Sequence, residues 1–179
     1  MVGQQAIYAL LLMSNPTILE VVPGSPAAAA GLRPGDEHVS VNGVVPTDVI
    51  EYQQIVDEGE VAVVIKRDGD ASDIEILKAE GAPLGLRLNS SIFDRVQTCD
   101  NHCEFCFIYQ LPPGMRTTLY LKDDDYRLSF LYGNFTTLTR FTELDLSRVV
   151  EERLGPLYVS IHATNPEVRS GMLRNPRGA

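Results

Sequence analysis

Short apolar and alternating stretches, separated by turns, fill residues 17–80 of the chain. Residues 17–23 (TILEVVP) are apolar and β-branched, which predicts a strand. Residues 37–43 (EHVSVNG) alternate and end in an Asn-Gly pair, which predicts a strand followed by a tight turn. Residues 60–77 (EVAVVIKRDGDASDIEIL) predict two strands joined at Asp68-Gly69, a hairpin signal.

Two helices are predicted within the same region. Ser25 can cap a short helix, Pro26 suits its first position and Gly31 suits its exit. Asp48 and Glu51 have the spacing of a capping box at the start of a second helix. The apolar stripe of that second helix consists of Val49, Tyr52 and Val56.

This order of elements, with SPAAAAGLRPGDEHVSVNG (25–43) at its centre, resembles a PDZ domain, and we assign residues 17–82 to it. Such a domain is expected to bind an extended peptide by strand addition, with the terminal carboxylate held by backbone amides. A PDZ-shaped packing module without a free peptide ligand is the alternative. Val39 and Val41 share one face of their strand. PDZ domains usually carry an aliphatic residue at the position of His38, and we interpret this histidine as a surface variant.

The usual carboxylate-binding loop of a PDZ domain does not precede Ile18. Residues 83–88 (PLGLRL) are a candidate for that loop from the other end of the domain, as in permuted bacterial forms. They lie within residues 83–92, which we interpret as a linker that contains this candidate strand. The linker begins in a stretch of small, turn-forming residues, AEGAPLG.

The pattern changes after this linker. Residues 119–141 (LYLKDDDYRLSFLYGNFTTLTRF) form an extended apolar run, residues 144–154 (LDLSRVVEERL) have a helical pattern, and residues 156–164 (PLYVSIHAT) predict a buried strand. Strand, helix and strand in this order predict βα units and a parallel sheet. Within the run, KDDDY (122–126) is interpreted as a solvated acidic turn, and a role of Asp123 to Asp125 in closing a site is a weaker hypothesis.

The composition of the 179 residues, 44% hydrophobic and 22% charged, is that of an ordinary globular protein. The net charge of −9 argues against a general nucleic-acid-binding protein, because phosphate contacts need a surplus of Lys and Arg. The apolar run at residues 6–13 is shorter than a membrane-spanning helix. We expect it to form a short helix or strand within an N-terminal extension, residues 1–16, that packs on the next domain.

All three cysteines lie in one octet, CDNHCEFC (99–106), with the spacing Cys99-x3-Cys103-x2-Cys106. Three clustered cysteines cannot build a disulfide framework, which favours a reducing cytoplasm. Four interpretations of the octet stay open at this point. They are the buried face of a helix, a structural zinc site with His38 or His162 as a distant fourth ligand, a redox dithiol at Cys103-x2-Cys106, and an iron–sulfur cluster with one iron left open.

The spacing Cys-x3-Cys-x2-Cys, with Phe105 just before the third cysteine, closely resembles the radical S-adenosylmethionine (radical SAM) superfamily. The resemblance implies that Cys99, Cys103 and Cys106 ligate a [4Fe-4S] cluster whose open iron binds S-adenosylmethionine. One electron, from a donor such as flavodoxin or ferredoxin, would then cleave the sulfonium and release a radical that abstracts hydrogen from a substrate.

The similarity extends from Ile18 to the end of the chain, including RVQTCDNHCEFCFIYQLPPGMRTTLYLKDDDYRLSFLYGNFTTLTR and LGPLYVSIHATNPEVRSGML. These segments resemble a bacterial family of iron–sulfur oxidoreductases that joins an N-terminal PDZ domain to a radical SAM core and a further domain of unknown function. The family implies no particular substrate.

The resemblance also suggests further cofactor-binding residues. Phe105 would pack beside the adenine, and Gly133 and Asn134 would end the strand LSFLYGNF, where the superfamily contacts the methionine amino group. Asn134 stands where an acid is usual, and a plain turn is the alternative. His162, with Thr164, would line the site from a later strand, and a core histidine is the alternative.

The predicted fold class is therefore α/β plus a small mixed module. A PDZ-like domain is followed, at residues 93–179, by about half of a radical SAM barrel. Only half is expected because the full barrel of about six βα units needs a longer chain. We accordingly expect a fragment of a longer protein. The leading hypothesis is a radical SAM enzyme. The rival is a PDZ-type peptide or protein interaction module with a structural zinc or cysteine loop. No membrane or nucleic-acid partner is indicated.

Overall fold

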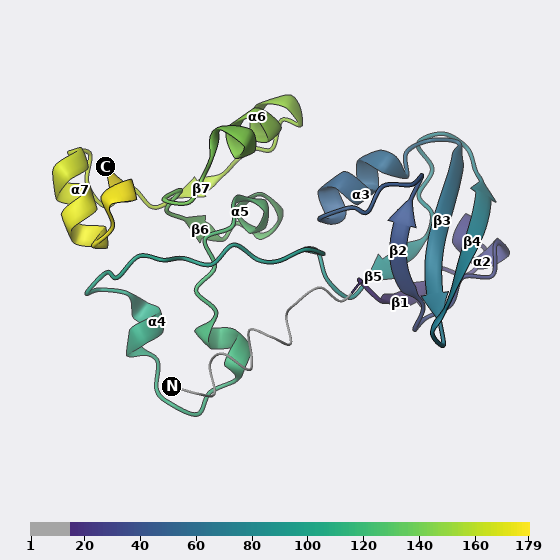
Figure 1. Ribbon diagram of the computed structural model, residues 1–179, viewed down its shortest axis with the longest axis horizontal. Helices are drawn as coiled ribbons and strands as arrows, with labels where there is room; N and C mark the ends of the chain where they lie inside the picture. Colours follow the sequence, from purple (N-terminus) through teal and green to yellow (C-terminus); the bar gives the residue numbers. More distant parts are fainter. Residues whose placement is uncertain (1–14) are drawn as a thin grey trace. The chain divides into compact units, whose positions relative to one another are not determined.

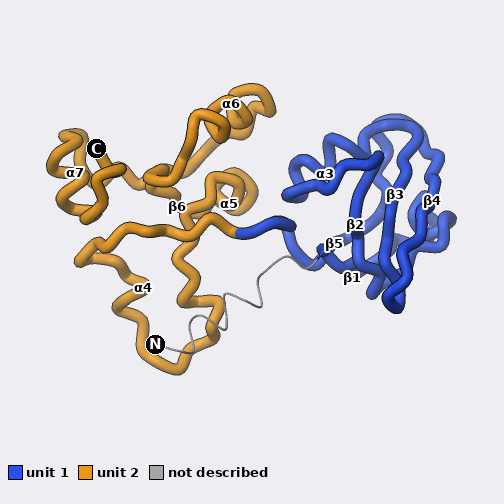
Figure 2. The backbone as a smooth tube through the Cα atoms, in the orientation of Figure 1, with its two compact units in different colours: residues 1–95 blue, residues 96–179 orange. Residues whose placement is uncertain are grey.

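The computed structural model describes residues 15–179. The chain divides into two compact units, residues 1–95 (unit 1) and residues 96–179 (unit 2), shown in Figure 2. The expected helix or strand at residues 6–13 lies outside the described residues. Each unit is described below by itself.

Unit 1 contains the predicted strands and helices (Figure 1). A three-stranded antiparallel sheet has the order β2-β3-β4, and a two-stranded sheet pairs β1 with β5. The strands are β1 (Ile18–Val21), β2 (Glu37–Val41), β3 (Glu60–Arg67), β4 (Asp70–Leu77) and β5 (Leu86–Leu88). The helices are α2 (Pro26–Ala29) and α3 (Val49–Ile55).

The predicted turn and cap signals are confirmed in atomic detail. Asp68 and Gly69 both have positive φ, 53° and 98°, as the tight hairpin between β3 and β4 requires. The Ser25 hydroxyl accepts the Ala28 N–H at 3.2 Å. The Asp48 carboxylate accepts two N–H groups of the first turn of α3, at 3.0 and 3.1 Å, which satisfies donors that the helix itself leaves unpaired.

Residues 83–88 form a strand and a tight turn. The Gly85 carbonyl accepts the Val22 N–H at 2.8 Å, and the Leu84 carbonyl accepts the Ala27 N–H at 3.0 Å. Gly85 has φ +82°, and a Cβ at this position would lie 2.3 Å from the Ser25 Cβ. Only glycine therefore allows this turn to pack against the start of α2.

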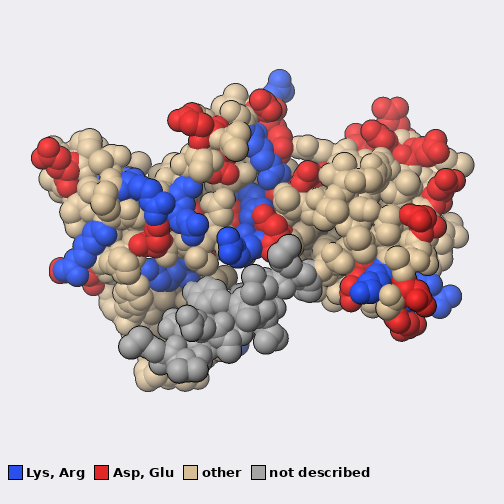
Figure 3. Space-filling model, viewed as in Figure 1, with Lys and Arg blue, Asp and Glu red and all other residues tan. Residues whose placement is uncertain are grey.

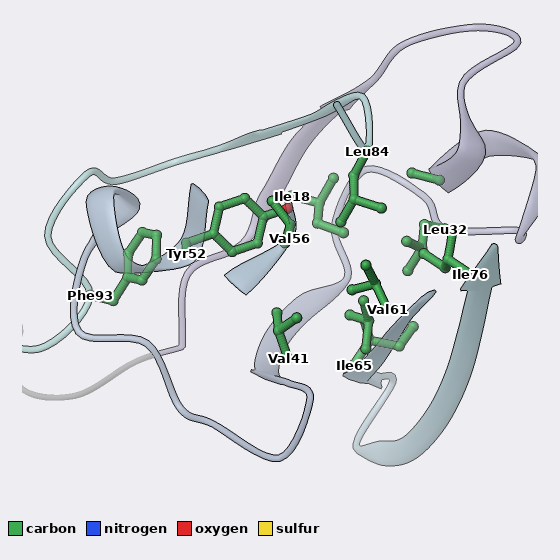
Figure 4. Close-up of a cluster of buried hydrophobic side chains, with 12 residues drawn as sticks. Ile18, Leu32, Val41, Tyr52, Val56, Val61, Ile65, Ile76, Leu84 and Phe93 are labelled. Atoms are coloured by element: carbon green, nitrogen blue, oxygen red, sulfur yellow. The ribbon is translucent and has the colours of Figure 1, made fainter. Parts of the chain in front are cut away.

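The hydrophobic core of unit 1 lies between its sheets and α3 (Figure 4). The core side chains come from all five strands, the two helices and the turns between them. The largest buried members are Ile18, Leu32, Val41, Tyr52, Val56, Val61, Ile65, Ile76, Leu84 and Phe93.

His38 is part of this interior, so its interpretation as a surface variant is wrong. The ring is fully buried and lies edge-on to Tyr52, with 5.3 Å between the ring centroids. The register of β2 shifts between His38 and Ser40, and this irregularity turns His38 and Ser40 inward, while Val39 stays half-buried. Among the described residues, neither ring nitrogen has a hydrogen-bond partner, and burial lowers the pKa of His38 from 6.5 to about 4.

Unit 1 should therefore lose stability as the pH falls from about 6.5 to about 4. In this window the unfolded chain binds a proton at His38 that the folded chain excludes, so the free energy of unfolding falls by about 3 kcal/mol. Hydrogen exchange of the β3 amides, corrected for its intrinsic pH dependence, measures this loss. His38→Val should abolish it and His102→Val, at an exposed position, should keep it. An unchanged pH profile in His38→Val would contradict the assignment.

Unit 2 contains short elements around a two-stranded parallel sheet (Figure 1). The predicted parallel pairing is confirmed, with Phe135 opposite Tyr158 and Thr136 opposite Val159. The predicted helix at 144–154 is also confirmed, but the strand predicted at 156–164 is short and only half-buried. The elements are α4 (Phe107–Gln110), η1 (Thr117–Tyr120), α5 (Tyr126–Tyr132), β6 (Phe135–Thr136), α6 (Glu143–Glu151), β7 (Tyr158–Val159), α7 (Pro166–Leu173) and η2 (Pro176–Gly178).

The strand predicted at LSFLYGNF is instead mostly the helix α5. Asp125 caps this helix by accepting the Arg127 N–H at 3.0 Å, and Gly133 ends it in the left-handed conformation, with φ 74°. Tyr126 and Ser129 are buried on one side of the helix. Local capping thus outweighs the strand-like apolar run, and the strand begins only at Phe135.

The buried side chains of unit 2 are mainly polar. Asp125 binds the Arg127 guanidinium at 2.8 Å and accepts the Gln97 N–H at 2.9 Å, while Asp124 is 4% exposed. The interpretation of KDDDY as a solvated turn is therefore wrong for these two carboxylates. The buried polar and charged residues of this unit are Asn101, Asp124, Asp125, Arg127, Ser129, Thr136, Thr139 and Asn175.

Candidate functional site

The cysteine octet is a loop without regular secondary structure that leads into α4. Cys106 lies at the N-cap position of α4, and its N–H donates to the Cys103 carbonyl at 3.2 Å. The hypothesis of a helix that buries one face of cysteines is therefore wrong. The three thiols are free, and each cysteine is half-buried.

Backbone hydrogen bonds fix the first and the fourth residues of the octet. The Cys99 N–H donates to the Lys122 carbonyl at 2.7 Å, beside an isolated bridge between Thr98 and Asp123. Further along, the His102 N–H donates to the Leu173 carbonyl at the end of α7, at 2.9 Å. The loop is thus held between the strand-like segment before α5 and the end of α7.

Asn101, which is 1% exposed, fixes the middle of the loop. Its side-chain amide donates to the Thr137 hydroxyl at 2.9 Å and accepts from the Asn175 amide at 2.7 Å. Thr137 follows β6 directly, and Asn175 follows α7. The buried amide of Asn101 therefore connects the backbone between Cys99 and Cys103 to the segment after β6 and to the segment after α7.

The carboxylate of Asp124 extends this network along the end of β6. It accepts the hydroxyls of Thr136 at 3.0 Å, Thr137 at 2.7 Å and Thr139 at 3.3 Å. We call Asn101, Asp124, Thr136, Thr137, Thr139 and Asn175 the polar network. It places the cysteine loop at the carboxyl end of a parallel strand, where α/β proteins commonly form their active sites.

Lys122 supplies a positive charge next to the thiols. Its ammonium donates to the Asn101 carbonyl at 2.8 Å and to the Tyr109 hydroxyl at 3.0 Å. Burial raises the pKa of the Cys99 and Cys103 thiols, and the Lys122 ammonium opposes this rise. Cys103 lies close enough to both other thiols for their charges to interact.

Two of the predicted cofactor residues meet. The rings of Phe105 and His162 lie 5.3 Å apart between centroids, although 57 positions separate them in sequence. Phe105 is 44% exposed and His162 is exposed as well, so the alternative of a core histidine is wrong. Thr164 is also exposed.

The other two predicted cofactor residues lie elsewhere. Gly133 ends α5 and Asn134 precedes β6, so both stand at the amino end of that strand. The Asn134 amide donates to Asp123 at 2.9 Å. At the carboxyl end stand Thr137 and Thr139, which the sequence interpretation missed although the run TTLT directly after a strand could have indicated them.

The three thiols match, in kind and number, what an iron–sulfur cluster with one open iron requires. Within residues 15–179, no three side chains of Cys, His, Asp or Glu are arranged around one point as metal ligands. Zinc would need a fourth ligand, and His38 is enclosed in the core of unit 1, whereas His162 is exposed and its ring lies beside Phe105 of the loop. The three thiols by themselves suffice for a cluster with one open iron, whereas structural zinc would require His162 as well.

Comparison with known families supports the resemblance to radical SAM proteins. The family model described as "Radical SAM-like domain" matches residues 78–179, more than half of the chain. The chain belongs to the radical SAM-like family. A PDZ domain model matches residues 17–67 of this radical SAM-like protein, so the predicted two-part organisation is confirmed.

Individual relatives of this radical SAM-like protein match only part of it. Proteins of Brucella suis and Brucella melitensis, each named "Putative zinc metalloprotease", are 39% identical over 66 residues, which are 35% of this chain and 17% of theirs. The chain thus spans about a sixth of these curated relatives. Among the described residues, no helix has the length and apolarity needed to cross a membrane.

Solved structures similar to this chain include two PDZ domains. The PDZ domain of the SdrC-like protein from Listeria monocytogenes is 19% identical, with 42% of this chain and 88% of that chain covered and a TM-score of 0.37. The PDZ domain of EpsC from Vibrio cholerae is 21% identical, with 42% and 91% covered and a TM-score of 0.27.

Asn101→Ala should loosen the cysteine loop. The change removes one hydrogen bond from the Thr137 hydroxyl and one from the Asn175 amide, so the free energy of unfolding of unit 2 should fall by about 2 kcal/mol. Hydrogen exchange across residues 97–106 measures the effect. Asn134→Ala, which removes a single half-exposed contact, is the control and should cost less than about 1 kcal/mol. Equal exchange in the two variants would contradict the role of Asn101.

Proposed function

We propose that this chain binds a [4Fe-4S] cluster through Cys99, Cys103 and Cys106 and uses it to cleave S-adenosylmethionine reductively. The observation that carries the proposal is the position of the loop: three free thiols held at the carboxyl end of β6 in a radical SAM-like protein. When bound, such a cluster supplies one electron to the sulfonium, which breaks a carbon–sulfur bond and starts radical chemistry on a substrate.

The protein's own part is to present three thiolates and leave the fourth iron without a protein ligand. The polar network restricts the loop backbone between Cys99 and Cys103, so the cluster would meet a partly organised loop. The exposed rings of Phe105 and His162 lie next to the loop and offer flat surfaces on which an adenine can stack.

Charge supports a protein electron donor. Lys and Arg side chains gather over unit 2 on the face shown in Figure 3, whereas acidic side chains are frequent over unit 1. Electrostatic complementarity would favour an acidic electron-transfer protein of the flavodoxin or ferredoxin kind. The free thiols suit a reducing compartment such as the cytoplasm.

Anaerobic reconstitution with iron and sulfide tests the proposal. The wild-type chain should bind about four irons and four sulfides, as a cubane cluster requires. Cys99→Ala, Cys103→Ala and Cys106→Ala should each lose most of this iron, because two thiolates cannot hold the cluster firmly. His102→Ala, in the same loop, is the matched control and should keep it. Full iron binding by Cys103→Ala, or zinc without sulfide in wild type, would contradict the proposal.

A second function, peptide binding by the PDZ domain, is favoured by the open edge of β5. The Gly85 carbonyl and the Asn89 N–H bond to residues 22 and 17, on the side of β1. Because backbone groups alternate along a strand, the N–H and C=O groups of Leu86 and Leu88 point away from β1. In the described part of the chain β5 pairs with β1 alone. The N–H groups of Leu84 and Gly85 likewise have no partner among the described residues, and could receive a carboxylate.

A peptide with an apolar last residue and a free carboxylate should therefore bind, and its amidated form should bind about tenfold more weakly or worse, because the charged hydrogen bonds are lost. Fluorescence anisotropy measures both affinities. Gly85→Ala should abolish binding, since a Cβ there collides with Ser25, and Gly59→Ala is the control. Equal affinity for the free and amidated peptides would rule out carboxylate recognition.

A further inference from the structure

Lys122 contacts the cysteine loop at two points and the following helix α4 at a third. Its carbonyl accepts the Cys99 N–H at 2.7 Å, and its ammonium donates to the Asn101 carbonyl at 2.8 Å. The same ammonium donates to the Tyr109 hydroxyl at 3.0 Å and lies 4.5 Å from the centre of the Tyr109 ring. One half-buried lysine therefore bridges the beginning of the octet and the helix that follows it.

Among the described residues, the Lys122 ammonium forms no ion pair with a carboxylate, while the nearby Asp124 carboxylate acts on the thiols with the opposite sign. The two acceptors of the ammonium, a carbonyl and a phenol, are neutral groups. The acidic residues of the octet are paired with other cations, Asp100 with Arg177 and Glu104 with Arg174. The Arg140 guanidinium is a further cation at the base of the loop, where it donates to the Thr98 carbonyl at 3.0 Å.

The geometry brings this positive charge close to the cysteines. The Lys122 ammonium is bonded to the carbonyl of Asn101, which lies two positions from Cys99 and two from Cys103 in the loop. Its other partner, Tyr109, lies three positions after Cys106. The ammonium is therefore held against the segment that carries the three cysteines.

We infer that Lys122 is a positioning residue that fastens the cysteine loop and supplies a fixed positive charge that raises the reduction potential of the cluster bound there. The inference rests on the proposed function. Reduction adds one negative charge to the cluster, and a cation close to it, in surroundings partly shielded from water, stabilises the reduced form.

Two variants separate the charge from the shape of the side chain. Lys122→Met keeps an unbranched chain of similar length without charge, and Lys122→Arg keeps the charge. Lys78→Met is the matched control, because Lys78 also donates to two carbonyls but belongs to unit 1. Each full-length protein is reconstituted with iron and sulfide, and the midpoint potential is measured by redox titration with dithionite, followed by electron paramagnetic resonance.

Lys122→Met should have a more negative midpoint potential than wild type, and Lys122→Arg and Lys78→Met should stay close to wild type. Loss of iron in Lys122→Met but not in Lys122→Arg would equally support a required charge. An unchanged potential in Lys122→Met would overturn the inference, as would equal loss of iron in both Lys122 variants. If wild type itself binds no iron, the proposed function fails instead.

A second readout needs no cluster. In the iron-free protein, Lys122→Met loses the bonds to Asn101 and Tyr109, so amides of residues 99–109 should exchange about tenfold faster than in wild type. Lys122→Arg should exchange at an intermediate rate. Unchanged exchange in Lys122→Met would show that the lysine does not fasten the loop.

Discussion

Unit 2 is stabilised mainly by the buried carboxylate of Asp124 and the groups bonded to it, rather than by a large hydrophobic core. Three threonine hydroxyls after the start of β6 converge on this carboxylate, and Asn101 joins them to the cysteine loop. A buried charge is costly unless hydrogen bonds satisfy it, so the network is stable in few arrangements. The position of the three thiols depends on this constraint.

Unit 1 shows the opposite principle. An apolar core of strand and helix residues fixes its shape, and the buried His38 is kept neutral by burial. The strand β5 pairs with β1 although most of the unit separates them in sequence. In the two functions that we propose, a peptide binds to unit 1 and the cluster to unit 2, so recognition and chemistry would lie in separate units of the chain.

Local signals in the sequence predicted much of the fold. Caps at Ser25 and Asp48, the Asp68-Gly69 hairpin and the parallel strands of unit 2 all follow from short-range rules. The strand prediction at α5 failed because local caps, Asp125 and Gly133, outweigh the apolar run. His38 and the acidic run failed for another physical cause. Their burial depends on partners distant in sequence, Tyr52 for His38 and Thr137 for Asp124, which no local pattern reveals. The three cysteines were evident from spacing, but Asn175, 74 positions from Asn101, was not.

In the function that we propose, three thiolates of one loop hold the cluster and leave one iron free for S-adenosylmethionine. Mössbauer spectroscopy of the protein reconstituted with iron-57, before and after addition of S-adenosylmethionine, detects such an iron. About one iron in four should change its signal as its coordination number rises. Spectra in which all irons stay equivalent and unchanged would show that no iron is open, and the proposed function would then be wrong.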